Sequence, residues 1–288
     1  MTPGAKKVAG VMGWPISHSL SPRLHGYWIE KYGLNADYRA WPVKAEDLDA
    51  RLRQLASECE AEGAVFRGTN LTIPLKEQAL SIVDELDASA RRIGAVNTVV
   101  VGKDGRLIGR NTDAIGFTDS LGEHMETTGL AGGTALVLGA GGAARAVATA
   151  LVDLGLGKIL ICNRSEARAQ SLAADIGDGA QSLAWEARAD VLDAVDILVN
   201  CTSLGMSGQP PLDISLDRLK KSAVVSDIVY VPLETDLLKM ARLQGNVAVD
   251  GLGMLLHQAK AGFAAWFGVT PGVDAALRHH VLQGLTQK

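Results

Sequence analysis

Strong charge of one sign and long apolar runs are both missing from this chain of 288 residues. The formal net charge is only −4, which gives no electrostatic case for binding nucleic acid or an anionic membrane surface. No uncharged apolar run reaches the roughly 18 residues that suggest a membrane-spanning helix. The N-terminal MTPGAKK also lacks the apolar core of a signal peptide. We therefore expect neither a nucleic acid nor a membrane as partner.

Cysteine is scarce as well, with Cys59, Cys162 and Cys201 as the three examples. They show no C-x-x-C spacing and cannot all pair, so we expect small buried thiols in a reducing cytoplasm. The six histidines lack metal-ligand spacing, and we expect no metal site. The apolar fraction of 47% and the charged fraction of 21% are those of an ordinary globular protein with one large or two smaller domains.

A glycine-rich turn between two apolar runs is the most informative feature of the sequence. Residues 134–138 and 158–162 predict strands, and apolar residues at helical spacing lie between them. Residues 139–144 read GAGGAA, which fits the fingerprint G-x-G-x-x-A. Glycines at a strand-to-helix turn let the backbone and the helix N-terminus approach a pyrophosphate. This context predicts a Rossmann-type unit that binds a dinucleotide.

The end of the second predicted strand bears on the choice of cofactor. An NAD site carries an acidic residue about 20 residues after the glycines, where it holds the ribose 2′-hydroxyl. This chain has Asn163, Arg164 and Ser165 there, with Arg168 one turn later and Glu166 as the acid nearby. A guanidinium pairs with a 2′-phosphate that a carboxylate would repel, which favours NADP over NAD. The alternative is that the two arginines are solvated charges at a helix start.

Strand and helix patterns alternate along the rest of the chain and predict an α/β fold of two units. Polar residues gather just after the predicted strands, where ligands bind in open parallel sheets. The predicted strands are residues 7–12, 37–41, 64–68, 195–200, 223–229 and 246–249, with a hairpin of 96–101 and 106–110. The predicted helices are residues 21–33, 46–57, 252–267 and 273–285, with another beginning at about Ala114.

Four polar residues outside the glycine loop are candidates for chemistry. If residues 14–20 are extended, Ser17 and Ser19 point to the same side and could hold a carboxylate, although capping or turn formation is an open alternative. Lys76 and Asp113 each stand just outside a predicted strand and could relay a proton for a carbonyl reduced by hydride. The alternatives are a surface lysine and a helix-capping aspartate.

Nine segments in a fixed order carry a resemblance to a known family. They are GWPISHSLSPRLH, TNLTIPLK, IGAVNT, NTD, GAGGAARA, NRSEAR, NCTSLGM, DIVYVPLET and DGLGMLLHQA. The chain resembles the shikimate dehydrogenase family across nearly its whole length. The resemblance implies reversible, NADPH-dependent reduction of 3-dehydroshikimate to shikimate, in the pathway to chorismate and aromatic amino acids.

The resemblance also implies roles for individual residues. Lys76 and Asp113 would be the catalytic pair, and Lys76 would donate the proton in reduction. Residues that would bind the substrate are Ser17 and Ser19, for its carboxylate, and Asn70, Thr72, Asn97, Tyr230 and Gln258, for the ring and its hydroxyls. Residues that would bind the cofactor are Gly139, Ala140, Gly141, Gly142 and Ala143 at the pyrophosphate, Asn163, Arg164, Ser165 and Arg168 at the 2′-phosphate, and Ile228 and Gly251 at the nicotinamide.

The same resemblance implies a division into two domains. Residues 1–113 and 251–288 would form a discontinuous substrate-binding catalytic domain, and residues 114–250 a Rossmann-type NADP-binding domain. This plan predicts a cleft that closes when the cofactor binds, in a monomer or a homodimer. The departures from the family pattern are Gly26, Ser165 and Cys201, where Asn, Thr and Ala are frequent, and none has a role in proton transfer.

Three other functions compete with this interpretation. A quinate/shikimate dehydrogenase of dual specificity resembles this chain, but such relatives tend to alter the serine pair or to place an acid near Arg164. A non-catalytic sensor of pathway metabolites would be expected to lose Lys76 or Asp113, and both are present. A structural protein with a vestigial nucleotide fold would leave the polar residues at the strand ends unexplained.

Overall fold

The computed structural model describes residues 4–286 and has the predicted α/β fold. The chain forms two compact units. Unit 1 contains the chain up to Thr112 and again from Gln258 onward, and unit 2 is Asp113–His257. Each unit is built on a sheet of six strands. Among the helices of the described residues, none is long and apolar enough to span a membrane.

The sheet of unit 1 is mixed. Its strands are β1 (Lys6–Gly13), β2 (Ala36–Pro42), β3 (Ala64–Leu71), β4 (Glu85–Leu86), β5 (Thr98–Val101) and β6 (Leu107–Arg110). They lie in the order β2-β1-β3-β5-β6-β4. The three long strands β1, β2 and β3 run parallel, and the β5–β6 hairpin joins β3 in antiparallel pairing. The carboxyl ends of β1 and β3 therefore meet at one edge of the sheet.

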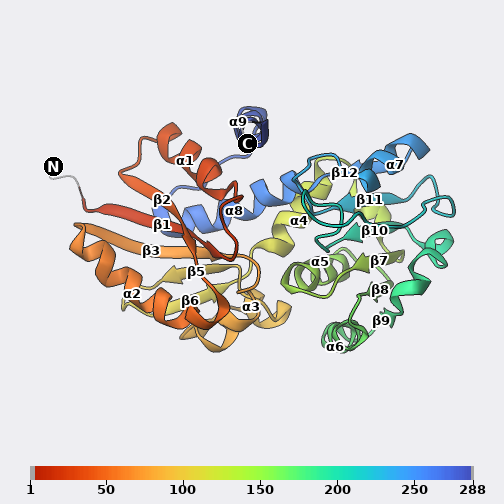
Figure 1. Cartoon of the computed structure of the whole chain (residues 1–288), viewed down its shortest axis with the longest axis horizontal. Helices are drawn as coiled ribbons and strands as arrows, with labels where there is room; N and C mark the ends of the chain where they lie inside the picture. Colours follow the sequence, from red (N-terminus) through yellow and green to blue (C-terminus); the bar gives the residue numbers. More distant parts are fainter. Residues whose placement is uncertain (1–3, 287–288) are drawn as a thin grey trace. The chain divides into compact units, whose positions relative to one another are not determined.

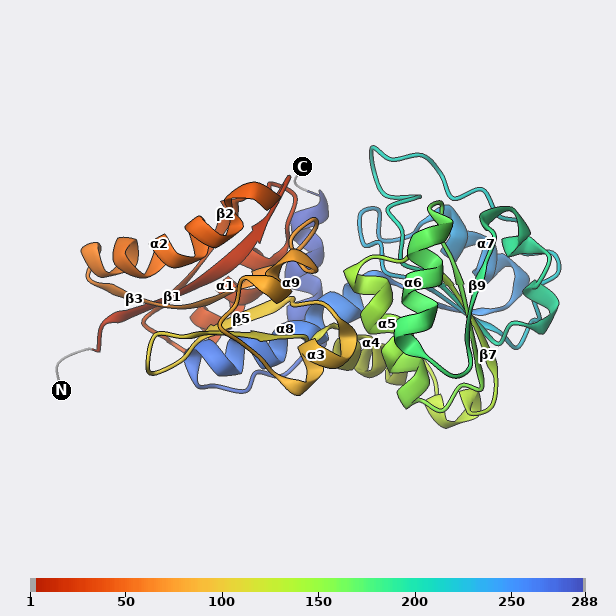
Figure 2. The same ribbon diagram turned by 90° about the horizontal axis from the view of Figure 1, so that it is seen from below.

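Helices cover both faces of this sheet. They are α1 (Ser21–Lys31), α2 (Leu48–Ala61), α3 (Ala88–Ile93), the second part of α8 (Gly251–Phe267) and α9 (Ala275–Thr286). Figure 2 shows α2 in orange and α8 in blue on opposite sides of the strands. The apolar side of α2 packs into the sheet through Leu48, Leu52 and Leu55. On the other side, Trp28 of α1 meets Phe263 of α8 edge to face.

Gly68 permits the close packing of α8 on the sheet. Its φ of +139° is rare for residues with a side chain, and a Cβ there would lie 2.4 Å from Trp266 Nε1. The same indole nitrogen donates a hydrogen bond to the Val99 carbonyl at 3.0 Å. A second link joins the C-terminal helix α9 to α1, where Arg23 Nε donates to the His280 carbonyl at 2.6 Å. These contacts hold the C-terminal segment in unit 1.

The sheet of unit 2 is fully parallel. Its strands are β7 (Thr134–Leu138), β8 (Lys158–Cys162), β9 (Ala180–Leu183), β10 (Ile197–Asn200), β11 (Val224–Asp227) and β12 (Val247–Val249), in the order β12-β11-β10-β7-β8-β9. Counted from β7, this is the 3-2-1-4-5-6 order of the Rossmann fold, read from its other edge. The predicted Rossmann-type fold is confirmed, and its switch point lies between β7 and β10.

Both faces of this sheet are buried, as expected for parallel strands. In β7, Ala135 and Val137 pack into one apolar cluster, and Leu136 and Leu138 pack into the other. The first cluster includes side chains of α4 (Asp113–Gly122), α5 (Gly142–Asp153) and α6 (Glu166–Ile176), and the second includes α7 (Asp236–Gln244). Figure 1 shows α5 and α6 beside β7, β8 and β9. The apolar run that predicts β7 is thus explained by burial on both faces.

Candidate functional site

The glycine loop lies at the carboxyl edge of the unit 2 sheet. The Gly139 N–H donates to the Cys162 carbonyl at 2.7 Å, and the Cys201 N–H donates to the Leu138 carbonyl at 2.8 Å. These bonds bring the ends of β7, β8 and β10 together. The chain that follows each of these strands therefore starts from the same edge of the sheet, at the switch point where ligands bind in this fold.

The backbone of the glycine loop is shaped for close approach. Gly139 has a φ of +112°, and a Cβ there would lie 3.0 Å from the Cys201 carbonyl oxygen. Gly141 is the extended N-cap of α5, and a Cβ there would meet nothing within 4 Å. The N-terminal N–H groups of α5 therefore follow an open turn with little side-chain cover. An anion such as a pyrophosphate fits this arrangement, because helix N-termini offer unpaired donors and a positive dipole end.

The segment after β8 carries the predicted 2′-phosphate residues. Arg164 and Arg168 are exposed, and the Asn163 side chain donates to the Ser165 carbonyl at 2.9 Å. The neighbouring acid, Glu166, accepts a hydrogen bond from Gln170 one turn along α6, at 3.0 Å. The strand end thus presents two guanidinium groups to solvent, which suits a phosphate dianion better than a ribose hydroxyl.

Ile228, Tyr230 and Gly251 follow the next two strands of this edge. A Cβ on Gly251 would lie 2.2 Å from the Ile228 carbonyl oxygen, so this contact requires glycine. The structure therefore brings the two residues predicted for the nicotinamide together. Tyr230 is half-buried, and burial raises the pKa of its hydroxyl above the ordinary value.

In unit 1, Asn70, Asn97 and Gln258 form a buried hydrogen-bond network. The Asn70 amide donates to the Asn97 carbonyl at 3.2 Å and to Thr98 Oγ1 at 3.1 Å. The Asn97 amide donates to Gln258 Oε1 at 3.3 Å across 161 residues of sequence. The three amides are 6%, 2% and 8% exposed, respectively. The structure therefore brings these three predicted substrate residues together.

Tyr38, Thr98 and Thr112, which were not predicted as site residues, extend this network. Tyr38 Oη donates to Asn70 Oδ1 at 2.7 Å. Thr112 donates from its backbone to Asn97 Oδ1 at 2.9 Å and from its hydroxyl to Gln258 Oε1 at 3.3 Å. Thr112 stands beside Asp113 in the segment NTD, which was a usable signal, whereas Tyr38 has only the pattern of a strand residue.

Thr72 and Lys76 lie on the connection that leaves β3. The Thr72 N–H donates to the Met12 carbonyl at 2.9 Å, and the Lys76 carbonyl accepts from the Val96 N–H at 2.8 Å. A Cβ on Gly13 would lie 2.4 Å from Thr72 Cγ2, so Thr72 packs on the end of β1. These bonds hold the segment with Lys76 at the edge of the sheet, next to the start of β5.

The connection that carries Ser17 and Ser19 differs from the extended form considered above. Residues 17 and 18 form a turn closed by a hydrogen bond from the Ser19 N–H to the Ile16 carbonyl, at 3.0 Å. Ser17 and Ser19 therefore do not alternate along an extended chain. Ser19 Oγ accepts from the Ser21 N–H at 3.3 Å, while the N-cap position of α1 is Leu20. The Ser19 hydroxyl therefore accepts a hydrogen bond at the start of α1 without occupying its N-cap position.

Asp113 is the first residue of α4 and is 4% exposed. Asp113 thus stands in the first turn of the helix that the sequence predicts from about Ala114. A buried carboxylate needs compensating partners, since burial of an uncompensated charge is costly.

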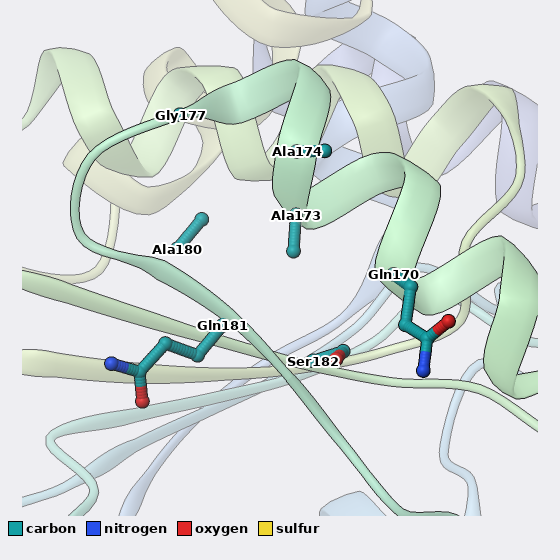
Figure 3. A pocket seen from close by; sticks show the side chains of 7 residues that line it. All are labelled: Gln170, Ala173, Ala174, Gly177, Ala180, Gln181 and Ser182. Carbon is teal, nitrogen blue, oxygen red and sulfur yellow. The ribbon is translucent and has the colours of Figure 1, made fainter.

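A pocket elsewhere in unit 2 is not a candidate for this chemistry. Figure 3 shows it between the end of α6 and β9. Its lining is uncharged and includes none of the predicted site residues: Gln170, Ala173, Ala174, Gly177, Ala180, Gln181 and Ser182. Within residues 4–286, no group of three or more His, Cys, Asp or Glu side chains could hold a metal ion.

Comparison with known proteins identifies the family. The family models described as shikimate dehydrogenase substrate binding domain, shikimate / quinate 5-dehydrogenase and shikimate 5′-dehydrogenase C-terminal domain match residues 11–99, 122–208 and 251–278. A protein of Paramagnetospirillum magneticum named shikimate dehydrogenase (NADP(+)) is 51% identical, over 97% of this chain and 99% of its own.

Solved structures agree with this assignment. Shikimate 5-dehydrogenase from Thermus thermophilus, in complex with NADP(H) and shikimate, has a TM-score of 0.84 at 36% identity, covering 97% of this chain and 100% of its own. Quinate dehydrogenase from Corynebacterium glutamicum, in complex with NAD, has a TM-score of 0.85 at 32% identity, covering 96% and 99%. The fold alone thus does not separate the two substrates. On the full-length sequence match, the chain belongs to the shikimate dehydrogenase family of oxidoreductases.

Proposed function

We propose that this protein is an NADP-dependent shikimate dehydrogenase that reversibly reduces 3-dehydroshikimate to shikimate, in the biosynthesis of chorismate and aromatic amino acids. The observation that carries the proposal is the full-length match to a relative named for this reaction and cofactor. The open glycine loop and the buried amide network support it, because they fit a dinucleotide and a polyhydroxylated ring respectively.

Unit 2 would hold the cofactor. Residues 139–143 would bind the pyrophosphate through backbone N–H groups. Arg164 and Arg168, with Asn163 and Ser165, would bind the 2′-phosphate, and exposure of both guanidinium groups supports this role. The close contact between Ile228 and Gly251 would place both residues beside the nicotinamide. A bound NADPH would supply the hydride for the reduction.

Unit 1 would hold most of the substrate contacts. Ser17 and Ser19 would donate to the carboxylate, because hydroxyl groups can satisfy an anion without adding charge. Thr72, Asn97 and Gln258 would bind the ring hydroxyls, with Tyr230 of unit 2. Asn70 would hold these side chains in place from behind and lie near the substrate, since its amide donates hydrogen bonds to Thr98 and to the Asn97 carbonyl.

Lys76 and Asp113 would complete the chemistry. As hydride adds to the carbonyl carbon, the oxygen gains negative charge, and Lys76 would donate the proton that neutralises it. In the reverse direction the same lysine would accept the proton of the hydroxyl. Asp113 would orient that hydroxyl for proton transfer with the lysine.

The dual-specificity quinate/shikimate dehydrogenase is the second candidate. The quinate dehydrogenase neighbour, in complex with NAD, has nearly the same fold, which keeps this candidate open. The serine pair and Arg164 favour shikimate and NADP.

We also propose the substrate and cofactor domains as given above, with 1–113 and 251–288 in one and 114–250 in the other. The free state of all three cysteines fits the cytoplasmic location that we propose.

Initial rates with four pairs of substrates test the proposal. Shikimate or quinate would be offered with NADP⁺ or NAD⁺ at mildly alkaline pH, and reduced nicotinamide followed by absorbance. We expect fast turnover only with shikimate and NADP⁺. Arg164→Ala should weaken the binding of NADP⁺ about ten- to a hundredfold and leave the binding of NAD⁺ unchanged, because only NADP⁺ carries the 2′-phosphate. Comparable rates with quinate or NAD⁺ would support dual specificity, and no turnover by folded protein that binds NADPH would support the sensor.

A further inference from the structure

Asp227, the last residue of β11, is a completely buried carboxylate that none of the roles above uses. Its Oδ1 accepts hydrogen bonds from the Asn200 amide and from the Val229 N–H, both at 3.0 Å. Its Oδ2 accepts from the Thr235 hydroxyl at 2.7 Å. The three donors come from the end of β10, from the chain after β11 and from the start of α7. One carboxylate therefore joins three segments.

Each segment is a connection at the carboxyl edge of the sheet. Asn200 shapes the turn after β10, because its Oδ1 accepts from the Thr202 hydroxyl at 2.7 Å and its amide donates to the Leu204 carbonyl at 3.1 Å. The bond from Val229 fixes the chain immediately before Tyr230. Thr235 stands at the end of the connection between β11 and α7. Its hydroxyl also accepts a hydrogen bond from the Leu238 N–H and so caps α7.

The pattern of donors favours an acceptor-only group at position 227. Thr235 Oγ1 accepts from the Leu238 N–H and directs its one proton to Asp227 Oδ2. The amide of Asn200 and the N–H of Val229 can only donate. An asparagine at position 227 would present an NH₂ group to one of these donors. Burial raises the pKa of Asp227 to about 6, so the ionised form is kept at neutral pH against a cost of desolvation.

We propose that Asp227 is a positioning residue that holds Tyr230 and the turn at 201–204 in the conformation used for substrate and cofactor. This rests on the proposed function, in which Tyr230 contacts the substrate ring. Asp227 touches neither ligand itself and acts through the two connections that it joins. Removal of its charge releases both connections while the sheet below them stays formed.

Asp227→Asn and Asp196→Asn form a matched pair for the test. Asp196 precedes β10 at the opposite end of the same sheet, where its carboxylate accepts from the Thr134 N–H at 2.8 Å and pairs with Lys220 at 2.8 Å. We expect Asp227→Asn to lower kcat/KM for shikimate about ten- to a hundredfold, mainly through KM. Asp196→Asn should change it less than about twofold. Equal effects of the two variants would overturn the proposal.

Combination with Tyr230→Phe shows whether the effect passes through Tyr230. If it does, the fold-decrease in kcat/KM of the Asp227→Asn, Tyr230→Phe double variant is smaller than the product of the two single fold-decreases. For Asp196→Asn with Tyr230→Phe, the fold-decrease in kcat/KM equals that product. A multiplicative loss for Asp227→Asn would contradict the proposal.

If Asp227→Asn does not fold, Thr235→Val and Thr235→Ser replace it, because only the serine keeps the hydroxyl. Thr235→Val should then be impaired and Thr235→Ser active.

Amide hydrogen exchange separates this proposal from the proposed function. Exchange at 201–204 and 228–234 should accelerate in Asp227→Asn but not in Asp196→Asn, whatever reaction the protein catalyses. If wild-type protein fails to oxidise shikimate but this acceleration appears, only the proposed function is wrong. If wild-type protein is active and both segments stay protected in Asp227→Asn, only the positioning role is wrong.

Discussion

His25 shows how far the surroundings of a residue decide its chemistry. Its ring is completely buried and stacks on Tyr38, with centroids 3.9 Å apart and Trp28 edge-on at 5.7 Å. Burial lowers the pKa of His25 from 6.5 to about 3, and the nearby Asn70 side chain offsets this only in part. Among the residues that the structure describes, neither ring nitrogen of His25 finds a hydrogen-bond partner of good geometry. The folded protein therefore holds His25 neutral across the physiological range of pH.

This neutral histidine makes folding sensitive to acid. Below about pH 6.5 His25 binds a proton in the unfolded chain but stays neutral in the folded chain. The free energy of unfolding therefore decreases as the pH falls toward 3. Between pH 7 and pH 5, wild-type protein should lose about 2 kcal/mol more unfolding free energy than His25→Phe does. Urea unfolding at both pH values measures this difference, with the exposed His279→Gln as control. The same pH response in wild type and His25→Phe would contradict the account.

Lys76 carries the clearest kinetic prediction at this scale. Lys76→Ala removes the proposed proton donor, so kcat should fall about 10²- to 10⁴-fold. The dissociation constant for shikimate, measured by equilibrium binding, should change much less. Lys103→Ala alters an exposed lysine in the β5–β6 turn and should leave both values unchanged. Equal losses in kcat and in affinity would mean that Lys76 binds the substrate and does not catalyse.

Sequence reasoning at the residue scale succeeded where a motif has its own geometry. The glycines at 139–142 were predictable because a strand-to-helix turn near a pyrophosphate demands them. Tyr38 and Asp227 were not, because their importance lies in hydrogen bonds to residues distant in sequence. For the serine pair an extended chain was one of two possibilities, and the turn closed on Ile16 corresponds to the other, turn formation.

At the scale of elements, two helix glycines should respond to alanine in opposite ways. In α1, a Cβ on Gly26 meets nothing within 4 Å, so Gly26→Ala should stabilise the protein by about 0.5–1 kcal/mol through helix propensity. In α8, a Cβ on Gly251 would lie 2.2 Å from a backbone oxygen. Gly251→Ala should therefore destabilise by about 3 kcal/mol or more. Thermal unfolding measures the melting temperature of each variant relative to wild type. A shift of the same sign in both variants would contradict the packing described here.

Strongly patterned elements were predictable and short or exposed ones were not. The buried runs that form β1, β7 and β8 lie close to their expected bounds, because burial on both faces leaves a continuous apolar signal. The edge strand β9 was missed, since its sequence AQSL is partly exposed and carries little apolar character. The two-residue strand β4 was missed for a similar reason: it is defined by its pairing with β6, which no local pattern reveals.

At the scale of the whole molecule, the chain leaves unit 1 after Thr112 and returns to it at Gln258. Hydrophobic periodicity predicted the C-terminal helices but could not show which unit they join. That information lies in long-range contacts such as the bond from Trp266 to Val99. The resemblance to a family implied that these helices join the first unit, and local sequence patterns alone left it open.

The division into two units predicts that the two ligands protect different parts of the chain from amide hydrogen exchange. NADP⁺ should protect residues 139–145 and 163–168 in unit 2, where the glycine loop and the arginines lie. Shikimate should protect residues 70–76 and 97–98 in unit 1. Peptide-level mass spectrometry of the full chain measures both. Protection by NADP⁺ concentrated in the strands of unit 1 would contradict the assignment of the cofactor to unit 2.

Isotope transfer tests the proposed reaction most directly. Wild-type protein would reduce 3-dehydroshikimate with NADPH that carries deuterium on the transferred face of nicotinamide C4, and the product would be analysed by mass spectrometry. We expect shikimate with one deuterium bound to carbon, and none on carbon when unlabelled NADPH is used in deuterated water, because the hydride comes from the cofactor and only the oxygen takes a proton from Lys76. Absence of shikimate, or carbon-bound label derived from the solvent, would contradict the account.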